Sequence, residues 1–183
     1  MQGRILSARK KKAMNKELPK RKKIRLENYD YSSAGAYFVT VCTQNRKKLF
    51  WKDNTNVGAD IIRPKEETLS SAGEIVDNAI NQISDRYENI LVDKYCIMPD
   101  HIHLIIFIMS DESGRIISAP TLQTVVGQMK RYVSKELGFP VWQKSFVDRV
   151  IRNDAGYRKI WEYIDNNPIK MDYAYDNIDF SEF

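Results

Sequence analysis

Hydrophobic positions along the chain follow two different periods. β-Branched and aromatic residues crowd residues 37–43, and apolar runs recur over residues 90–97 and 101–108, a pattern typical of strands. Between and after them, apolar residues spaced three or four apart mark residues 75–87, 122–137 and 154–166, which predicts three amphipathic helices. Residues 141–147 and 150–152 are short and apolar enough to be extended.

Capping residues and glycines set the expected ends of these helices. Ser71-Ala72-Gly73-Glu74 matches a capping box for the first helix. Pro120, preceded by Ser118 or Ala119, suits the first turn of the second, and Gly138 ends it. Asp154 is expected to cap the third, which Pro168 stops.

The order of these elements predicts an α+β fold. Pro99-Asp100 forms a tight turn between the second and third strands, so these two pair as a hairpin. The order strand, helix, hairpin, helix, strand, helix fits a ferredoxin-like antiparallel sheet with helices packed on one face. We expect a flexible basic arm over residues 1–23, one domain over 24–170 and an acidic, aromatic tail over 171–183.

Composition narrows the class of protein. No apolar run approaches the roughly 18 residues of a membrane span, and no apolar stretch follows the charged N-terminus as in a secretory signal. Cys42 and Cys96 lie far apart and are expected to be free thiols in a reducing cytosol. The net charge is +5, and ten basic residues fall within residues 9–25. That cluster favours a nucleic-acid partner, although a solvated basic tail without a specific role would look the same.

The chain has only two histidines, His101 and His103, at the start of the third predicted strand. Residues i and i+2 of a strand point to the same face, so the two imidazoles project side by side. Such a pair can bind a divalent metal when further ligands complete the shell. The alternative is two half-buried histidines with a structural role only.

The last predicted helix offers a phenol and an amide one turn apart. Tyr163 and Asn167 lie on one flank of its apolar stripe, and Lys159 lies one turn before Tyr163 on the same flank. Tyr163 could be a nucleophile or a packing residue, and Asn167 a metal ligand or a helix C-cap. Position on the helix does not separate these roles.

Several of these segments, in this order, resemble the HUH-type single-tyrosine transposases, and most closely the REP-associated tyrosine transposases. The resemblance runs from about Arg25 to Ile169. It is carried by the segments Gly35-Ala36-Tyr37-Phe38-Val39-Thr40-Val41-Cys42-Thr43, Met98-Pro99-Asp100-His101-Ile102-His103-Leu104, Val141-Trp142-Gln143 and Tyr163-Ile164-Asp165-Asn166-Asn167-Pro168. One position departs from the family pattern, because Asp148-Arg149 stands where relatives often carry an acidic residue followed by histidine.

The resemblance implies a role for each matching position. His101, His103 and Asn167 correspond to the metal ligands, with Mg²⁺ or Mn²⁺ as the expected ion, and Tyr163 corresponds to the nucleophile. Because Pro168 follows Asn167 directly, Asn166 and Asp165 stay open as alternative ligands. The substrate would be single-stranded or hairpin DNA, and the candidate backbone contacts are Arg25, Lys130, Arg131, Arg149, Arg152 and Lys159.

The activity implied is that of a metal-dependent strand transferase that cleaves and rejoins DNA through a 5′-phosphotyrosine. Two alternatives stay open, a non-catalytic module that binds hairpin DNA or RNA and a metal-dependent nuclease that uses water. We expect a cytoplasmic, nucleoid-associated protein with no membrane partner. Whether it acts as a monomer or as a homodimer is not decided by the sequence.

Overall fold

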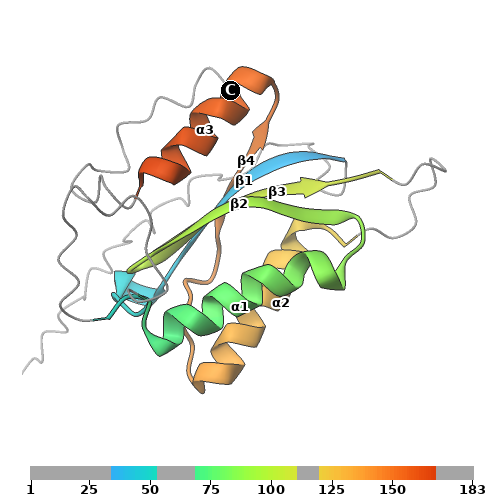
Figure 1. Cartoon of the computed structure of the whole chain (residues 1–183). Coiled ribbons are helices and arrows are strands. Elements are labelled where there is room, and N and C mark those ends of the chain that lie inside the picture. The colour runs from blue at the N-terminus through green and yellow to red at the C-terminus, as the bar shows by residue number, and fades with distance from the viewer. Residues whose placement is uncertain (1–33, 53–68, 111–119, 168–183) are drawn as a thin grey trace, which may run out of the picture.

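A four-stranded antiparallel sheet forms the centre of the protein (Figure 1), as seen in a computed structural model that describes residues 34–52, 69–110 and 120–167. The strands are β1 (Gly35–Cys42), β2 (Ile90–Met98), β3 (His101–Ile108) and β4 (Val147–Ile151), in the spatial order β2-β3-β1-β4. The helices are α1 (Ser71–Arg86), α2 (Leu122–Leu137) and α3 (Asp154–Asn166), and a short 3₁₀ turn, η1 (Gln44–Arg46), follows β1. The expected basic arm, the acidic tail and most of the two polar connections lie outside the described residues.

The expected ferredoxin-like arrangement is confirmed, because the order β1-α1-β2-β3-α2-β4 and the strand order are those of that fold. The helices, however, do not all pack on one face: α1 and α2 cover one side of the sheet and α3 covers the other (Figure 1). The physical reason lies in β3, which is buried along nearly its whole length on both sides. A strand with two apolar faces needs cover on each.

Alternation along β3 decides which side chains meet which helix. His103 and Phe107 contact tyrosines of α3, so residues 101, 103, 105 and 107 point to that side. The intervening residues point toward α1 and α2. Tyr95, the cross-strand partner of Leu104, confirms this direction, since its hydroxyl donates to Asp77 of α1 at 2.7 Å.

Local capping differs from expectation by about one residue at each helix start. Ser70, not Ser71, caps α1 by accepting from the Gly73 amide at 3.1 Å, and Asn153, not Asp154, caps α3 by accepting from the Gly156 amide at 2.8 Å. Thr121 caps α2, so Pro120 lies outside the helix and not in its first turn. Neighbouring Ser, Asn and Asp residues are all good caps, so sequence alone does not choose between them. Gly138 ends α2 as expected, with φ of 76°.

Residues 141–147 differ from the expected strand. Only Trp142 pairs there, through an isolated bridge to Thr43, and the regular strand β4 begins at Val147. Two backbone hydrogen bonds hold the segment, from the Gln44 amide to the Val141 carbonyl at 2.7 Å and from the Gln143 amide to the Cys42 carbonyl at 2.9 Å, and Lys130 adds to them. Its ammonium donates to the backbone carbonyls of Gln143 at 2.8 Å, Ser145 at 3.3 Å and Lys144 at 3.4 Å.

Candidate active site

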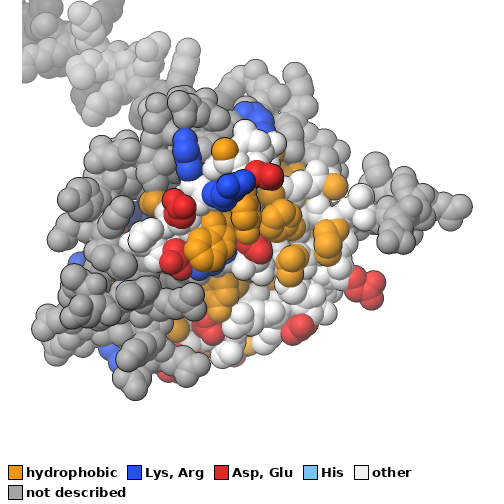
Figure 2. Space-filling view, turned by 45° about the horizontal axis from the view of Figure 1, so that its top comes forward, with side chains coloured by type: hydrophobic (Ala, Val, Ile, Leu, Met, Phe, Trp, Pro, Cys, Tyr) orange, Lys and Arg blue, Asp and Glu red, His pale blue; other side chains and the backbone are white. Residues whose placement is uncertain are grey.

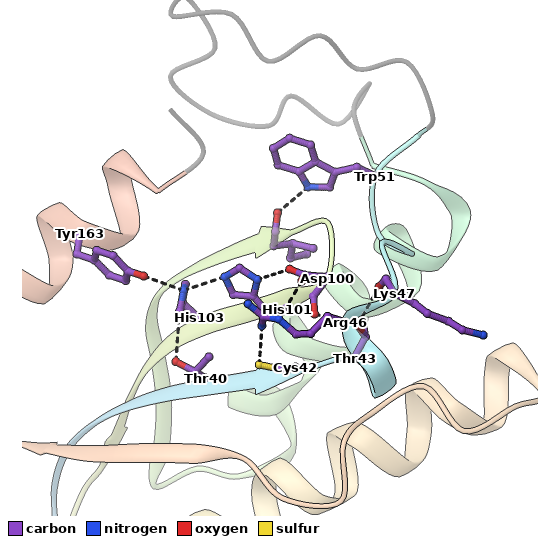
Figure 3. Close-up of polar contacts among 11 residues, drawn as sticks. Thr40, Cys42, Thr43, Arg46, Lys47, Trp51, Asp100, His101, His103 and Tyr163 are labelled. Atoms are coloured by element: carbon purple, nitrogen blue, oxygen red, sulfur yellow. Dashed lines mark hydrogen bonds and ion pairs between the residues drawn. The ribbon is translucent and has the colours of Figure 1, made fainter. Parts of the chain in front are cut away.

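The two histidine rings meet at their Nε2 atoms, which lie 3.1 Å apart on the α3 side of the sheet (Figure 3). Both side chains are buried, His103 completely. The rings are nearly perpendicular, at 80°, with centroids 4.7 Å apart. Two nitrogens at this spacing can each lie about 2.1 Å from one shared cation. The pair therefore points its inner nitrogens at a common position, as the strand alternation predicted.

Asp100 orients the first ring. Its Oδ1 atom lies 2.6 Å from His101 Nδ1, and its Oδ2 atom lies 3.1 Å from Arg46 Nε. Burial alone would raise the pKa of Asp100, but the hydrogen bond from His101 and the nearby His101 and Arg46 outweigh burial and lower it. An ionised carboxylate can only accept, so His101 Nδ1 carries the hydrogen. In the neutral ring this leaves the Nε2 lone pair directed at the shared position.

Thr40 orients the second ring. Its hydroxyl oxygen lies 2.9 Å from His103 Nδ1, across the β1–β3 pair in which the two residues are partners. Complete burial, together with the proximity of His101 and Arg46, lowers the pKa of His103 well below its usual value. The ring is therefore neutral at pH 7. Since a hydroxyl can either donate or accept, Thr40 suits the tautomer that leaves Nε2 free of hydrogen.

The turn that precedes His101 is held by backbone hydrogen bonds to the segment after β1. The Asp100 carbonyl accepts from the Thr43 amide at 2.9 Å, and the Pro99 carbonyl accepts from the amides of Leu49 at 2.8 Å and Phe50 at 3.1 Å. Asn45 and Arg46, within this segment, have φ values of 57° and 54°, which are unusual for residues other than glycine. Here they bring the Arg46 guanidinium back to Asp100 and to the Cys42 sulfur, 2.9 Å away.

Tyr163 reaches the histidine pair from α3. Its hydroxyl lies 3.3 Å from His103 Nε2, and the two ring centroids are 5.2 Å apart (Figure 3). Phe38 packs on both rings, at 5.3 Å from His103 and 6.0 Å from Tyr163. The geometry thus places Tyr163 beside the histidines, while its ring also packs against the core, and its role as nucleophile stays a prediction.

Asn167 follows α3 directly, one turn after Tyr163, as its helical C-cap. The side chain is buried, and its Nδ2 atom has no hydrogen-bond partner. A buried amide nitrogen without a partner suits a site that holds a further group, because rotation of the amide exchanges its oxygen and nitrogen. The two alternative ligands are engaged elsewhere: Asp165 pairs with Lys94 at 2.6 Å, and exposed Asn166 donates to the Glu162 carbonyl.

Neither cysteine is placed to be a thiolate ligand. Burial raises the pKa of Cys42, although Arg46 opposes the shift, and burial raises the pKa of Cys96 to about 12. Both are free thiols, as expected. Within the described ranges no group of three His, Cys, Asp or Glu side chains could hold a metal ion. The third ligand that the family resemblance implies, the Asn167 amide, is of another type.

The predicted basic contacts divide between the two sides of the sheet. Arg149 is exposed on edge strand β4 and pairs with Phe38, which places it on the histidine side. Arg152 and Lys159 are exposed just before α3 and within it. Arg131 is exposed on α2, behind the sheet, where Lys130 binds backbone carbonyls. Arg25 lies outside the described residues.

Sequence reasoning missed Thr40, Asp100 and Arg46 as partners of the histidines. The role of Asp100 could have been predicted from its position in the sequence, since a carboxylate directly before a ligand histidine can orient the histidine ring. Thr40 could be found only from the register that pairs it with His103, and Arg46 only from the backbone shape of η1.

Comparisons with known proteins show what the chain is similar to. An uncharacterized protein of Haemophilus influenzae is 31% identical over 168 residues, which cover 81% of this chain and 88% of that protein. A second Haemophilus influenzae protein, called a "putative REP-associated tyrosine transposase", is 26% identical over 164 residues, covering 81% of this chain and 80% of its own length. A solved REP-associated tyrosine transposase bound to a REP hairpin matches with a TM-score of 0.55 at 20% identity, over 82% of this chain and 76% of that one. The chain is thus similar to REP-associated tyrosine transposases.

The resemblance seen in the segments from β1 to α3 is thereby confirmed. No protein-family model matches the chain. The solved REP-associated tyrosine transposase supports the fold found here, an α+β arrangement around an antiparallel sheet. Among the helices that the structure describes, none is both long and apolar enough to cross a membrane.

Proposed function

We propose that the protein cleaves and rejoins single-stranded or hairpin DNA through a covalent bond between Tyr163 and a 5′-phosphate, with Mg²⁺ or Mn²⁺ bound by His101 and His103. The observation that carries this proposal is the convergence of three atoms. The Nε2 atoms of the two histidines lie 3.1 Å apart, and the Tyr163 hydroxyl lies 3.3 Å from one of them.

The residues present fit a divalent cation. Asp100 and Thr40 bind the outer nitrogens of the two rings, which favours inner nitrogens with free lone pairs. Two nearby lone pairs facing each other in a buried site repel, and a shared cation would remove that repulsion. Asn167, whose buried Nδ2 atom lacks a hydrogen-bond partner, is the candidate for a third ligand, and phosphate oxygens or waters would complete the shell. When bound, the ion would withdraw charge from a non-bridging phosphate oxygen and orient the leaving oxygen.

The chain's own groups account for the rest of the reaction. The Tyr163 oxygen attacks the phosphorus, the bond from phosphorus to the 3′-oxygen breaks, and a 5′-phosphotyrosine and a free 3′-hydroxyl result. The phenol gives up one proton and the leaving oxygen takes up one, so the step is balanced without another reactant. His103 Nε2 cannot accept the phenolic proton while it binds a cation. That proton leaves to solvent, since Tyr163 is only partly buried. Attack by a 3′-hydroxyl on the phosphotyrosine reverses the step and rejoins DNA.

The test is adduct formation on a denaturing gel. Wild-type protein is mixed with labelled single-stranded hairpin DNA and Mg²⁺ or Mn²⁺, and a band that survives denaturation and disappears after protease digestion reports the phosphotyrosine. Tyr163→Phe should abolish this band. Tyr95→Phe is the matched control, because Tyr95 bonds to Asp77 on the opposite side of the sheet and should leave the band unchanged.

Three results would contradict the proposal in different ways. An adduct formed by Tyr163→Phe would assign the nucleophile elsewhere. Cleavage by wild type without an adduct would favour a nuclease that uses water. Tight hairpin binding with no cleavage in any divalent metal would favour a non-catalytic binding module.

A further inference from the structure

Helix α3 carries Tyr163, and its other flank is fixed to the edge strand β2. The Lys94 ammonium lies 2.6 Å from Asp165 Oδ1 and 3.6 Å from the centroid of the Trp161 ring. Tyr157 donates to Asp93 Oδ2 at 2.7 Å, and this hydrogen bond, more than burial, raises the pKa of Tyr157 to about 12. Lys94 and Asp165 are both largely screened from solvent, with side-chain exposures of 16% and 29%. We call the contacts of Asp93 and Lys94 with α3 the β2 clamp.

A β-bulge makes the clamp possible. Val92 pairs with Ile106 and Lys94 pairs with Ile105, so Asp93 is an extra residue in β2. In a regular strand, neighbouring residues point to opposite faces. The bulge instead lets both Asp93 and Lys94 reach α3. The β2 clamp thus depends on a local irregularity of the strand, which turns the side chains of Asp93 and Lys94 toward the same helix.

The clamp and the phenol lie on opposite flanks of α3. Tyr157, Trp161 and Asp165 are spaced by four residues and share one flank, along β2. Ile160 and Ile164, both buried, form the middle of the helix face against the sheet. Tyr163 and Asn167 share the other flank, toward His103. Rotation of α3 about its axis therefore moves the phenol toward or away from the histidines.

Helix α3 packs against few of the described elements. Figure 2, which looks onto the α3 side, shows hydrophobic side chains at the surface next to both basic and acidic ones. Among the described residues, α3 contacts only β2 and β3 of the sheet substantially. A side-chain tip lies roughly 6 Å from its helix axis, so a rotation of about 10° displaces it by about 1 Å. Misplacement of a reacting group by about 1 Å can cost a factor of about 100 in rate.

We propose that Lys94 is a positioning residue, which sets the rotation of α3 through Asp165 and Trp161 and thereby places the Tyr163 oxygen at the histidine pair. The inference rests on the proposed function for its catalytic consequence. Lys94 does not touch the reacting atoms. Its effect passes through the helix, so it should alter the rate of the covalent step and not the affinity for DNA.

The experiment compares Lys94→Ala, Lys94→Arg and the control Arg86→Ala. Arg86 is exposed at the end of α1, on the other side of the sheet, and its removal matches the loss of charge. Single-turnover adduct formation is measured at saturating hairpin DNA, and hairpin affinity is measured separately. We expect Lys94→Ala to slow adduct formation by about 10- to 100-fold with affinity within about twofold. Lys94→Arg should restore the rate to within a few-fold, because a guanidinium can pair with Asp165 and stack on Trp161.

A second measurement does not depend on activity. Hydrogen exchange of the α3 amides should quicken at least tenfold in Lys94→Ala, while the amides of α1 and α2 stay as protected as in wild type. Unchanged rate and exchange in Lys94→Ala would overturn the inference, as would an equal rate loss in Arg86→Ala. If wild type forms no adduct, the proposed function fails, and exchange in α3 alone then decides whether Lys94 positions the helix.

Discussion

Tyr163 and His103 are separated by 60 positions in the chain, yet the phenol oxygen of one lies 3.3 Å from Nε2 of the other. Phe38, from a third element, packs on both rings. The contact joins α3 to the centre of the sheet at the one place where two buried imidazoles converge. The relationship between this helix and this strand decides the chemistry proposed above.

The carboxylate of Asp100 should matter for metal affinity. Asp100→Asn removes the charge that holds His101 Nδ1 and should weaken Mn²⁺ binding by about 10- to 100-fold. Calorimetric titration of the two proteins with Mn²⁺ measures the change. Asp77→Asn is the control, since Asp77 lies on α1 behind the sheet. Equal affinities for Asp100→Asn and wild type would mean that Asp100 does not support a metal ligand.

Thr40 should contribute to stability through its bond to a buried ring. Thr40→Val keeps the shape of the side chain but removes the hydroxyl that contacts His103 Nδ1. Loss of a buried hydrogen bond costs about 1–3 kcal/mol, so the urea midpoint should fall accordingly. Thr124→Val, at an exposed position of α2, should change the free energy of unfolding by less than about 0.5 kcal/mol. A Thr40→Val protein as stable as this control would show that the hydroxyl is dispensable.

His103 should make the metal-free protein sensitive to mild acid. Its pKa in the folded state is well below 6.5, while in the unfolded chain it is close to that value. As the pH falls below about 6.5 the unfolded chain takes up the proton first, so this group lowers stability by up to about 1.4 kcal/mol per pH unit. The stability that the neutral His103 ring contributes is fully present above pH 6.5. It is lost as the pH falls toward the pKa of His103 in the folded state.

Urea unfolding in a metal chelator between pH 5 and 8 measures this dependence. His103→Gln cannot titrate, so its stability should fall less steeply with acid, by the equivalent of one proton. Parallel curves for the two proteins would assign the acid sensitivity to other groups.

Two helical glycines should respond oppositely to alanine. A Cβ at Gly73 would collide with the backbone carbonyl of Phe50, which also accepts from the Ser70 amide at 2.9 Å. Gly73→Ala should therefore destabilise the protein by about 1–3 kcal/mol, as overpacking does. At Gly127 of α2 an added Cβ meets nothing within 4 Å, so Gly127→Ala should stabilise by about 0.5–1 kcal/mol. Thermal unfolding compares the pair, and a Gly73→Ala protein as stable as wild type would contradict the close approach.

Features fixed by local periodicity could be predicted from the sequence. The shared face of His101 and His103 followed from strand alternation, and the ferredoxin-like order followed from the succession of apolar periods. The flank of α3 that carries Tyr163 and Asn167 followed from helical spacing. Each of these depends only on residues close together in the chain.

Features that depend on pairing across the fold could not be predicted in the same way. The side of the sheet taken by α3 depends on which face α1 and α2 leave open, and the prediction of helices on one face was wrong because β3 is buried on both sides. Thr40 meets His103 only because of the β1–β3 register. The β2 clamp depends on a bulge at Asp93, and the two adjacent charged residues Asp93 and Lys94 interrupt the apolar run without showing which of them is the extra residue.

That bulge makes the effect of a deletion in β2 depend on where the deletion falls. Val92 and Lys94 already pair with neighbouring residues of β3, so without Asp93 the strand would alternate regularly and all the other residues of β2 would keep their partners and their faces. Such a deletion would remove only the acceptor of Tyr157 from the β2 clamp. Deleting a residue elsewhere in β2 would instead turn the residues on one side of the deletion to the opposite face. Relatives of this protein should therefore tolerate the loss of one residue at the bulge far better than the loss of one elsewhere in β2.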